Sequence, residues 1–441
     1  METKTVSISN GSRDFIADTS WSLISLAFQV AAGAALNLGL FFYFGPEPLG
    51  VFNQAYAAFV ISGQLFVFGL NDSALKYSAE HLRNKAEQAC LASSVLFWAC
   101  VAGVIGAVSM VVFATSMGPH FFSDTVQLGL LLMAPGLFLF VFNKVLVGIL
   151  IGRHQFFRLA ILQALRAVIL VLLVFAVVVL ALPLGLIGAC FTATEIIVVL
   201  AQADIVRQIF RDRSPVSEFQ GEFARWSRTH LVFGGLSMPH GVLSESFIRI
   251  DILVLAFFLD DASIGIYSFA AFIIEGVYQV PVLIRNITNP RLVRIFSNRD
   301  FPGLLRQVAQ SGGSSLLLTV STAAAIMWVL PIVNARLNIT AFNAIYEIIG
   351  YAFIGLVFYS FFIPFDFGFL QGGSPALQSV FMFSVTSINV VANIVLIPDY
   401  GLMGAAIGTA GAMVASGIIL TILLTVTFRI WAWPFLPVES L

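Results

Sequence analysis

The sequence is poor in charged residues. Asp, Glu, Lys and Arg make up 10% of the 441 residues, whereas 59% are hydrophobic and the mean hydropathy is +0.96. A soluble globular domain carries about 25% charged residues, so this composition excludes an ordinary soluble protein. The formal net charge of −1 also provides no basic surface for a polyanion, and we therefore expect no nucleic-acid partner.

Cysteine and histidine are also scarce. The cysteines Cys90, Cys100 and Cys190 lie in or beside apolar stretches and lack the CxxC spacing of zinc and redox sites. The histidines are dispersed without the spacing of metal ligands. The sequence therefore indicates no disulfide framework, no metal site and no cofactor. Its first residues also lack the apolar core and cleavage site of a signal peptide.

Long apolar runs fill most of the chain. A transmembrane helix needs about 20 mostly apolar residues, and runs of this length lack the two-residue alternation of barrel strands. The sequence therefore predicts an all-α, polytopic membrane protein. We expect about 12 transmembrane helices, at residues 21–44, 49–70, 88–116, 126–151, 160–181, 184–204, 229–259, 264–284, 312–331, 345–368, 376–396 and 403–430.

Basic residues are distributed unevenly between the two sides of these spans. If the N-terminus is cytoplasmic, every Lys and Arg except Arg336 and Arg249 falls in an inside segment. This bias follows the positive-inside rule and predicts that both termini are cytoplasmic. The outside loops are short, and the longer inside loops, at 205–228 and 285–311, are basic. No extramembrane catalytic domain fits, so we expect no enzyme.

Two short motifs recur at nearly one offset. "LGVFNQA" from Leu49 resembles "IGIYSFA" from Ile264, and "LGLIGA" from Leu184 resembles "YGLMGA" from Tyr400. Each pair opens corresponding spans of the two halves. An even number of spans per half orients both halves alike, which predicts a parallel repeat of two six-helix lobes. Two lobes around a shared cavity indicate transport by alternating access.

The repeat also predicts the domain organisation, in which a basic linker joins the two lobes. We expect a cytoplasmic tail at 1–20, an N-terminal lobe at 21–204, a cytoplasmic linker at 205–228, a C-terminal lobe at 229–430 and a cytoplasmic tail at 431–441.

Glu245 and Arg249 fall near the middle of a predicted span. A charge at this depth costs about 2.5–3.5 kcal/mol on insertion scales and usually faces protein or a wet cavity. At about 100° per residue the two side chains are about 40° apart and share a helix face. The planar guanidinium of Arg249 suits a pyrophosphate or an acidic sugar. An internal ion pair with Glu245 is the alternative, and both hold if substrate competes for Arg249.

Other acidic residues in the spans have open roles. Asp251 is about 200° around the helix from Arg249 and must face elsewhere. Asp251, Glu275 and Glu195 are candidates for coupling to protons or sodium ions, or for pairing helices. Two further acids, Asp72 and Asp366, lie toward inside ends, where a structural role is favoured.

Proline and small residues mark two helices. Pro239 interrupts a long span and predicts a kink, so Pro239 and Gly241 are a candidate hinge, with plain geometric accommodation as the alternative. Small residues recur every four positions on the last span and predict a face for close helix packing. These residues are Gly404, Gly408, Ala412 and Ser416.

Three stretches resemble a known family. "RIDILVLAFFLDDASIGIYSFAAFI", with Asp251, Gly265 and Tyr267, is similar to the signature of the seventh and eighth helices of polysaccharide-export flippases. "IPDYGLMGAAIGTA" and "VLVGILIGRHQFFRLA" resemble two further turns of the same family. The resemblance is to the Wzx-type O-antigen and exopolysaccharide flippases of the MOP superfamily, which also contains MATE drug exporters and lipid II flippases. This sequence differs from the lipid II flippases in having few basic residues in the helices of the first lobe. Only Lys144 and Arg166 approach the membrane region there.

The resemblance implies a MATE-like, V-shaped pair of lobes in the cytoplasmic (inner) membrane. It implies that undecaprenyl-pyrophosphate-linked oligosaccharide repeat units move from the inner to the outer leaflet, with a polysaccharide polymerase and glycosyltransferases as candidate partners beside the lipid bilayer. A MATE-type, cation-coupled multidrug exporter is the alternative. A membrane glycosyltransferase or polymerase would need catalytic acids or bases, commonly on a sizeable loop, and the short outside loops disfavour it. A scaffold would leave the intramembrane charges unexplained.

Overall fold

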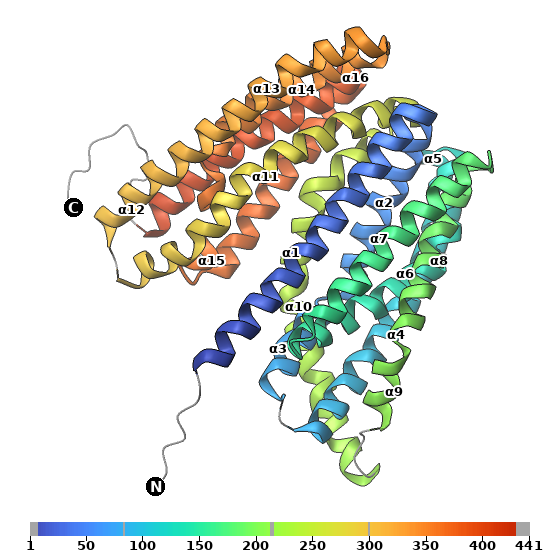
Figure 1. The fold of residues 1–441 in the computed structure, drawn as a ribbon, viewed down its shortest axis with the longest axis vertical. Coiled ribbons are helices and arrows are strands. Elements are labelled where there is room, and N and C mark those ends of the chain that lie inside the picture. Colours follow the sequence, from blue (N-terminus) through green and yellow to red (C-terminus); the bar gives the residue numbers. More distant parts are fainter. Residues whose placement is uncertain (1–7, 83, 212–215, 299, 429–441) are drawn as a thin grey trace. The chain divides into compact units, whose positions relative to one another are not determined.

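The computed structural model describes residues 8–82, 84–211, 216–298 and 300–428 of the chain (Figure 1). Residues 1–7, the start of the predicted tail at 1–20, and residues 429–441, which include all of the predicted tail at 431–441, lie outside the described residues. The described residues form helices joined by short turns and contain no β-strand. The predicted all-α class is confirmed.

The chain divides into two compact units, Met1–Val242 and Leu243–Leu441. The division falls inside one helix, α10 (Val216–Leu255). Much of the predicted linker at 205–228 is also helical, because α9 (Ala203–Arg211) covers its start and α10 covers its end. The helix α10 therefore belongs partly to each unit.

The first unit is built around α6 (Asp124–Gly152), which packs against α2, α3, α4 and α8. Its side chains Leu130, Met133 and Leu137 are fully buried, because nearly every face of this apolar helix meets another helix. The other elements of the unit are α1 (Ile8–Gly39), η1 (Leu40–Phe44), α2 (Pro46–Val67), α3 (Leu70–Glu80), α4 (Lys85–Ser116), α5 (Gly118–Phe121), α7 (Phe156–Val179), η2 (Leu184–Leu186) and α8 (Ile187–Ala201).

The predicted span at 49–70 corresponds to α2, and the chain bends sharply where that helix ends. Phe68 and Gly69 adopt left-handed conformations, with φ of 52° and 66°, and the chain bends by 53° between α2 and α3. A side chain at Gly69 would collide with the carbonyl oxygen of Gly234 and the hydroxyl of Ser237, both on α10. The break therefore needs glycine for its backbone conformation and for the close approach of α10.

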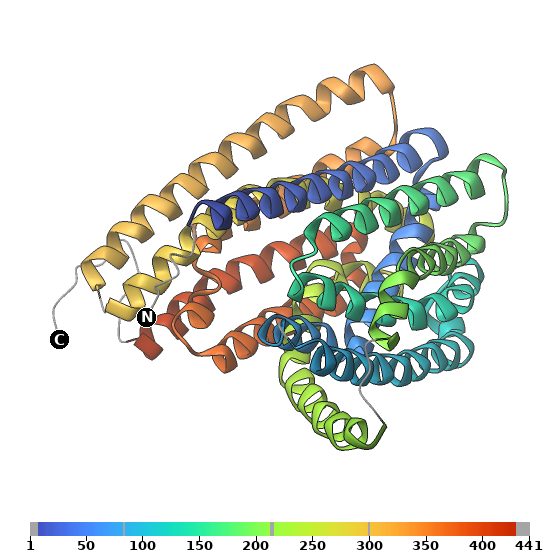
Figure 2. The same cartoon turned by 60° about the horizontal axis from the view of Figure 1, so that its bottom comes forward.

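The second unit continues from α10 into the long helix α11 (Asp261–Asn298), which packs against α13 and α14 (Figure 2). The predicted loop at 285–311 is largely helical, because α11 extends to Asn298 and two short helices follow it. The elements after α11 are α12 (Phe301–Gln307), η3 (Val308–Gly312), α13 (Gly313–Leu337), α14 (Ala341–Ser360), η4 (Ile363–Phe365), α15 (Gly368–Gln371) and α16 (Pro375–Phe428).

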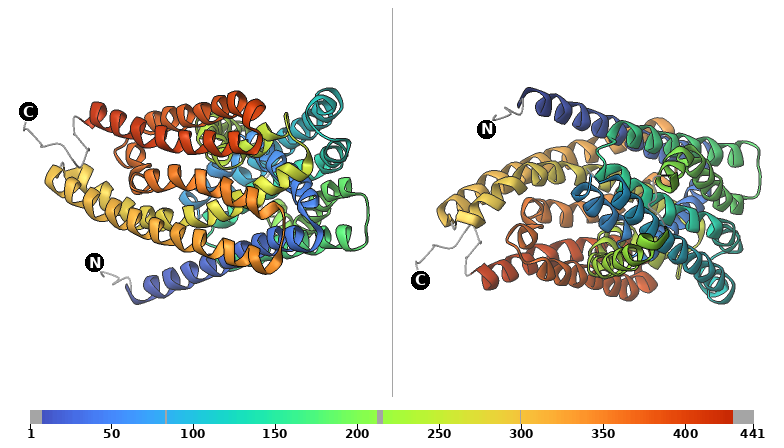
Figure 3. Two further views of the ribbon diagram at one scale, coloured as in Figure 1. Left: turned by 90° about the horizontal axis from the view of Figure 1, so that it is seen from above. Right: turned by 90° about the horizontal axis from the view of Figure 1, so that it is seen from below.

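The last two predicted spans form the two arms of α16, which is broken at Gly401 with φ 54° and ψ −131° (Figure 3). A side chain at Gly404 would collide with the backbone of Leu396 on the first arm, and one at Gly408 would collide with Asn393. The predicted close packing of this small-residue face is confirmed.

Many helices are long and apolar enough to cross a membrane. Of the described residues, 9 such helices qualify, or up to 10 if the bent pair α2–α3 is one span. One of the 9 is the stretch of α16 from Ala376 to Thr427, which contains two predicted spans, whereas α10 is not among them. The chain is a multi-pass membrane protein, and the number of 12 spans stays a prediction.

Candidate functional site

The predicted pair of Glu245 and Arg249 is present on α10. A guanidinium nitrogen of Arg249, Nη1, donates to Glu245 Oε2 at 2.7 Å, one helical turn away. The side chains remain 20% and 33% exposed, respectively. Glu275, on the neighbouring helix α11, also interacts electrostatically with Arg249 and is exposed. The structure thus brings three of the predicted site residues together where they can be reached from outside the unit.

This group carries more negative than positive charge, since two carboxylates share one guanidinium. Arg249 keeps five donor hydrogens in a planar fork and can bond more than one oxygen at a time. Glu245 and Glu275 accept hydrogen bonds and can bind the hydroxyl or amino groups of a ligand. The group is therefore able to contact both anionic and hydroxyl-rich parts of a substrate.

Asp251 lies in a separate, buried cluster and is 7% exposed. Its Oδ1 accepts from Asn393 Nδ2 at 2.8 Å, and its Oδ2 accepts from Thr409 Oγ1 at 2.7 Å and from the Tyr267 hydroxyl at 3.1 Å. Asn393 also donates to Asn389 Oδ1 at 2.8 Å. The cluster joins α10 and α11 to both arms of α16. These partners agree with the prediction that Asp251 faces a different site from Arg249.

Asp251 differs from the other deeply buried acids in having only neutral partners in the described part of the chain. Glu195 and Asp366 are each paired with an arginine. Moreover, Asn393 is fully buried and its Oδ1 has no hydrogen-bond partner there. Burying a carboxylate without a counter-charge is costly, and the usual remedies are protonation or a bound cation. The carboxylate, amide and hydroxyl oxygens here are hard donors that suit a small cation.

A second buried charge pair in this unit joins α11 to the turn after α14. Arg285 Nη1 donates to Asp366 Oδ2 at 2.8 Å, and the guanidinium lies 4.3 Å from the centre of the Phe367 ring. The two side chains are 14% and 7% exposed, respectively. The sequence assigns Arg285 to an inside loop and Asp366 to a structural role without pairing them. The sequence signal that could have predicted this pair is that Arg285 and Asp366 carry opposite charges and both lie toward inside ends of predicted spans.

In the first unit, Glu195 on α8 links three helices through hydrogen bonds. Its Oε2 accepts from Arg166 Nη2 on α7 at 2.8 Å and from Asn143 Nδ2 on α6 at 2.6 Å. Gln202 donates to Asn143 Oδ1 at 2.9 Å, which extends the network. Glu195 is 2% exposed, so this acid is already neutralised and sealed from solvent. The sequence alone did not indicate Asn143 or Gln202.

The candidate hinge residues lie just before the boundary between the two units. The helix α10 continues through Pro239, and the boundary follows Val242. A side chain at Gly241 would collide with the amide of Gln64 on α2. Gly241 therefore permits α10 to approach α2 closely within the first unit. This packing role is separate from the predicted role of Gly241 as a hinge.

A family model with the description "Polysaccharide biosynthesis protein" matches residues 17–295, which is more than half of the chain. The chain belongs to this family. The match covers most of the first unit, all of α10 and most of α11, and therefore includes Arg249, Asp251 and Glu275. The predicted resemblance to a family of polysaccharide biosynthesis is confirmed. A search of curated proteins finds no match for this family member.

Solved structures show the same fold at low sequence identity. An inward-facing multidrug resistance MATE family transporter of the MOP superfamily is 16% identical, with a TM-score of 0.71, and the match covers 92% of this chain and 98% of that chain. The lipid II flippase MurJ, in an inward closed conformation, is 16% identical, with a TM-score of 0.72 and coverage of 92% and 87%. A MOP superfamily transporter from Pyrococcus furiosus is 16% identical, with a TM-score of 0.54 and coverage of 94% and 95%. This family member therefore has the MOP-superfamily fold.

Proposed function

We propose that the protein is a flippase for lipid-linked oligosaccharides. It moves undecaprenyl-pyrophosphate-linked repeat units from the inner to the outer leaflet of the cytoplasmic membrane by alternating access of its two lobes. Membership of the polysaccharide biosynthesis family and the fold shared with a lipid II flippase support this proposal. Both termini are cytoplasmic, and a polymerase and glycosyltransferases are the expected partners. The protein carries a substrate across the membrane and does not alter it chemically.

The observation that carries the proposal is the reachable guanidinium of Arg249 among two carboxylates. The other intramembrane charge pairs, Glu195 with Arg166 and Asp366 with Arg285, each contain a nearly inaccessible carboxylate. In our proposal the substrate competes with Glu245 for Arg249, which bonds the pyrophosphate or an acidic sugar. Glu245 and Glu275 accept hydrogen bonds from the sugar hydroxyls.

Asp251 is our candidate for the coupling site. It is the deeply buried acid without a cationic partner in the described residues, and its cluster contains the oxygens of Thr409 and Asn389 beside the amide of Asn393. We propose that a proton or a sodium ion binds there and neutralises the carboxylate as the transporter changes state. The same cluster ties α10 to α16, so its occupancy is suited to control the end of α10 that follows Pro239 and Gly241.

Deletion of the gene followed by complementation tests the proposal. We expect the deletion strain to accumulate undecaprenyl-linked oligosaccharide on the cytoplasmic side and to lose surface polysaccharide. Arg249→Ala should fail to restore export while reaching the membrane in normal amounts. Arg158→Ala is the matched control, because Arg158 pairs with Asp204 on the exposed surface. Normal export by Arg249→Ala would remove Arg249 from the binding site.

A cation-coupled multidrug exporter is the second candidate. The surplus of carboxylate around Arg249 favours it, because a cationic drug is attracted to acids and a pyrophosphate is not. Drug susceptibility of the deletion strain separates the two functions. Increased susceptibility with unchanged surface polysaccharide would support the exporter and refute the flippase.

A further inference from the structure

The last part of α11 lies beyond the length that a membrane requires. The helix has 38 residues and, at about 1.5 Å per residue, is about 57 Å long. The hydrocarbon core is only about 30 Å thick. The C-terminal turns of α11, which carry Arg291 and Arg294, therefore extend beyond the core, and α12 follows them. We call residues 285–298 and 300–308 the α11–α12 arm.

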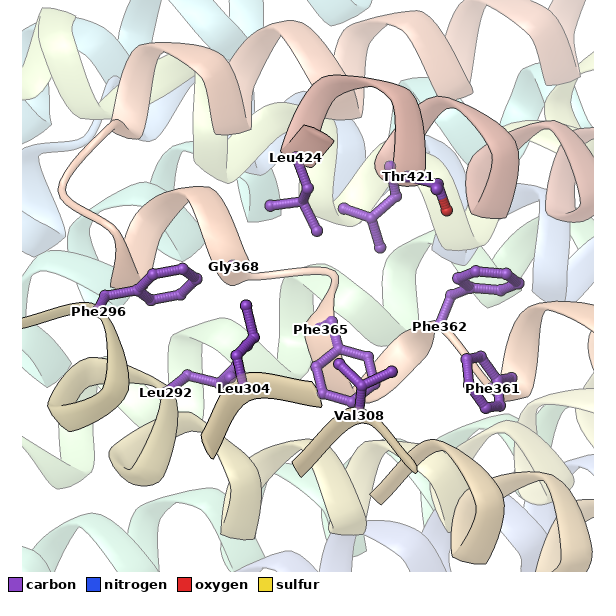
Figure 4. A pocket seen from close by; sticks show the side chains of 11 residues that line it. Leu292, Phe296, Leu304, Val308, Phe361, Phe362, Phe365, Gly368, Thr421 and Leu424 are labelled. Carbon is purple, nitrogen blue, oxygen red and sulfur yellow. The ribbon is translucent and has the colours of Figure 1, made fainter. Parts of the chain in front are cut away.

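One face of this arm packs on the second unit. Leu292 and Phe296 of α11, and Leu304 and Val308 just after it, line an apolar pocket opposite aromatic side chains of the segment after α14 (Figure 4). The buried pair of Arg285 and Asp366 fixes the start of the arm two turns earlier on the same stripe of α11. The orientation of the arm is therefore set by contacts on its apolar side.

The remaining faces of the arm carry exposed arginines beside the exposed apolar side chains Ile287 and Val293. Arg291, Arg294 and Arg306 are all exposed. At about 100° per residue, Arg294 is about 160–200° from Leu292 and Phe296, and Arg306 is similarly opposite Leu304. In the described part of the chain these arginines make no ion pair, whereas Arg158 and Arg225 of the first unit are paired with acids.

The nearby acid, Asp300, carries one negative charge and cannot neutralise three arginines. Asp300 caps the start of α12 by accepting from the backbone N–H of Gly303 at 2.9 Å. Three exposed guanidinium groups thus remain on a helical segment whose other side is apolar and anchored. Basic segments at the ends of transmembrane helices lie near the lipid headgroups, where anionic lipids attract each cation by about 1 kcal/mol.

We propose that the α11–α12 arm binds the headgroups of anionic phospholipids. Arg291, Arg294 and Arg306 contact the lipid phosphates, while Leu292, Phe296, Leu304 and Val308 hold the arm on the protein. The arrangement couples the lipid charge of one leaflet to the end of α11, the helix that carries Glu275. The ligand is a lipid surface, and neither the transported substrate nor a protein partner is needed for its binding.

The test uses the full-length protein in a neutral detergent, with phosphatidylglycerol and phosphatidylcholine of identical chains as probes. Lipid affinity is measured by titration and bound lipids are counted by native mass spectrometry. The variant Arg291→Gln/Arg294→Gln/Arg306→Gln should bind phosphatidylglycerol about a hundredfold more weakly. Its binding of phosphatidylcholine should not change. Raising the salt concentration should remove the preference of the natural protein.

A control variant removes the same charge from the first unit. Its changes are Lys85→Gln, Arg207→Gln and Arg228→Gln, all at exposed positions. This variant should keep the affinity of the natural protein within about threefold. Equal losses in both variants would show diffuse attraction by net charge and overturn the proposal. The absence of any preference for phosphatidylglycerol would also overturn it. A third contrary result would be that the arm variant binds lipid like the natural protein but loses the binding of acidic proteins. Thermal unfolding of both variants confirms that each is folded.

Discussion

The pair of Arg285 and Asp366 allows a sharp test of how buried charge is tolerated in the second unit. The ions are in direct contact at 2.8 Å, and their side chains are 14% and 7% exposed. Arg285 Nε and Asp366 Oδ1 have no hydrogen-bond partner in the described residues. The pair is therefore incompletely satisfied, and its attraction must offset a large loss of hydration.

Removing one partner leaves the other charge buried and uncompensated. We expect Asp366→Leu and Arg285→Met each to lower the free energy of unfolding by about 3–5 kcal/mol. The double variant Arg285→Met/Asp366→Leu should lie within about 1 kcal/mol of the natural protein, because packed apolar side chains replace an ion pair at little net cost. The coupling energy between the two positions should therefore be several kcal/mol.

Equilibrium unfolding of the purified protein in mixed micelles measures these differences. The matched control is the pair Arg158 and Asp204, whose side chains are 45% and 58% exposed. Removing either control partner should cost at most about 1 kcal/mol, because water screens an exposed ion pair.

Two outcomes would refute the reasoning. Single variants at Arg285 and Asp366 that cost no more than the control would show that water reaches the pair. A double variant as unstable as the sum of the two single variants would show that the groups act separately and that their ion pair is not what stabilises the native state.

Three further predictions concern stability measured by thermal unfolding. Glu195→Ala should cost about 3–5 kcal/mol, because it leaves the charge of Arg166 without its buried partner; a loss below about 1 kcal/mol would contradict this. Gly69→Ala should cost at least about 1–3 kcal/mol, since φ is +66° and the new side chain meets α10; a neutral effect would show that the break relaxes freely. Asp260→Ala should cost about 1 kcal/mol at neutral pH, because Asp260 Oδ1 accepts from the N–H of Ser263 at the start of α11. Hydrogen bonds from the side chain and the backbone N–H of Ser263 lower the pKa of Asp260, so the difference should persist in mild acid and disappear as pH falls through the folded-state pKa. A difference independent of pH would refute the capping role.

Local sequence patterns predicted contacts only where the partners lie on one helix. Glu245 and Arg249 are a turn apart, so helical geometry alone brings them together, and the structure has this ion pair. The small residues Gly404 and Gly408 likewise predicted close helix packing, but the pattern did not identify the packing partner. The break at Gly69 was missed because it depends on contacts with α10, and the helices within the predicted loop at 285–311 were missed because they depend on contacts with the body of the second unit.

Partners that are distant in the sequence could not be predicted. Asp251 meets Asn393 and Thr409 more than a hundred residues later, and Arg285 meets Asp366 across several helices. No periodicity connects such positions, since the connection depends on how helices pack.

The amino-acid sequence by itself determined the membrane class, the helical architecture and the family. The length of an apolar run and a short motif both depend only on residues that are consecutive in the chain. It also determined that Glu245 and Arg249 share a face. Only the tertiary structure decided which intramembrane charges are neutralised. Helix packing pairs Glu195 and Asp366 with arginines, surrounds Asp251 with neutral donors and leaves Arg249 partly exposed. The cost of a buried charge depends on its neighbours in space, and the order of residues along the chain does not specify them.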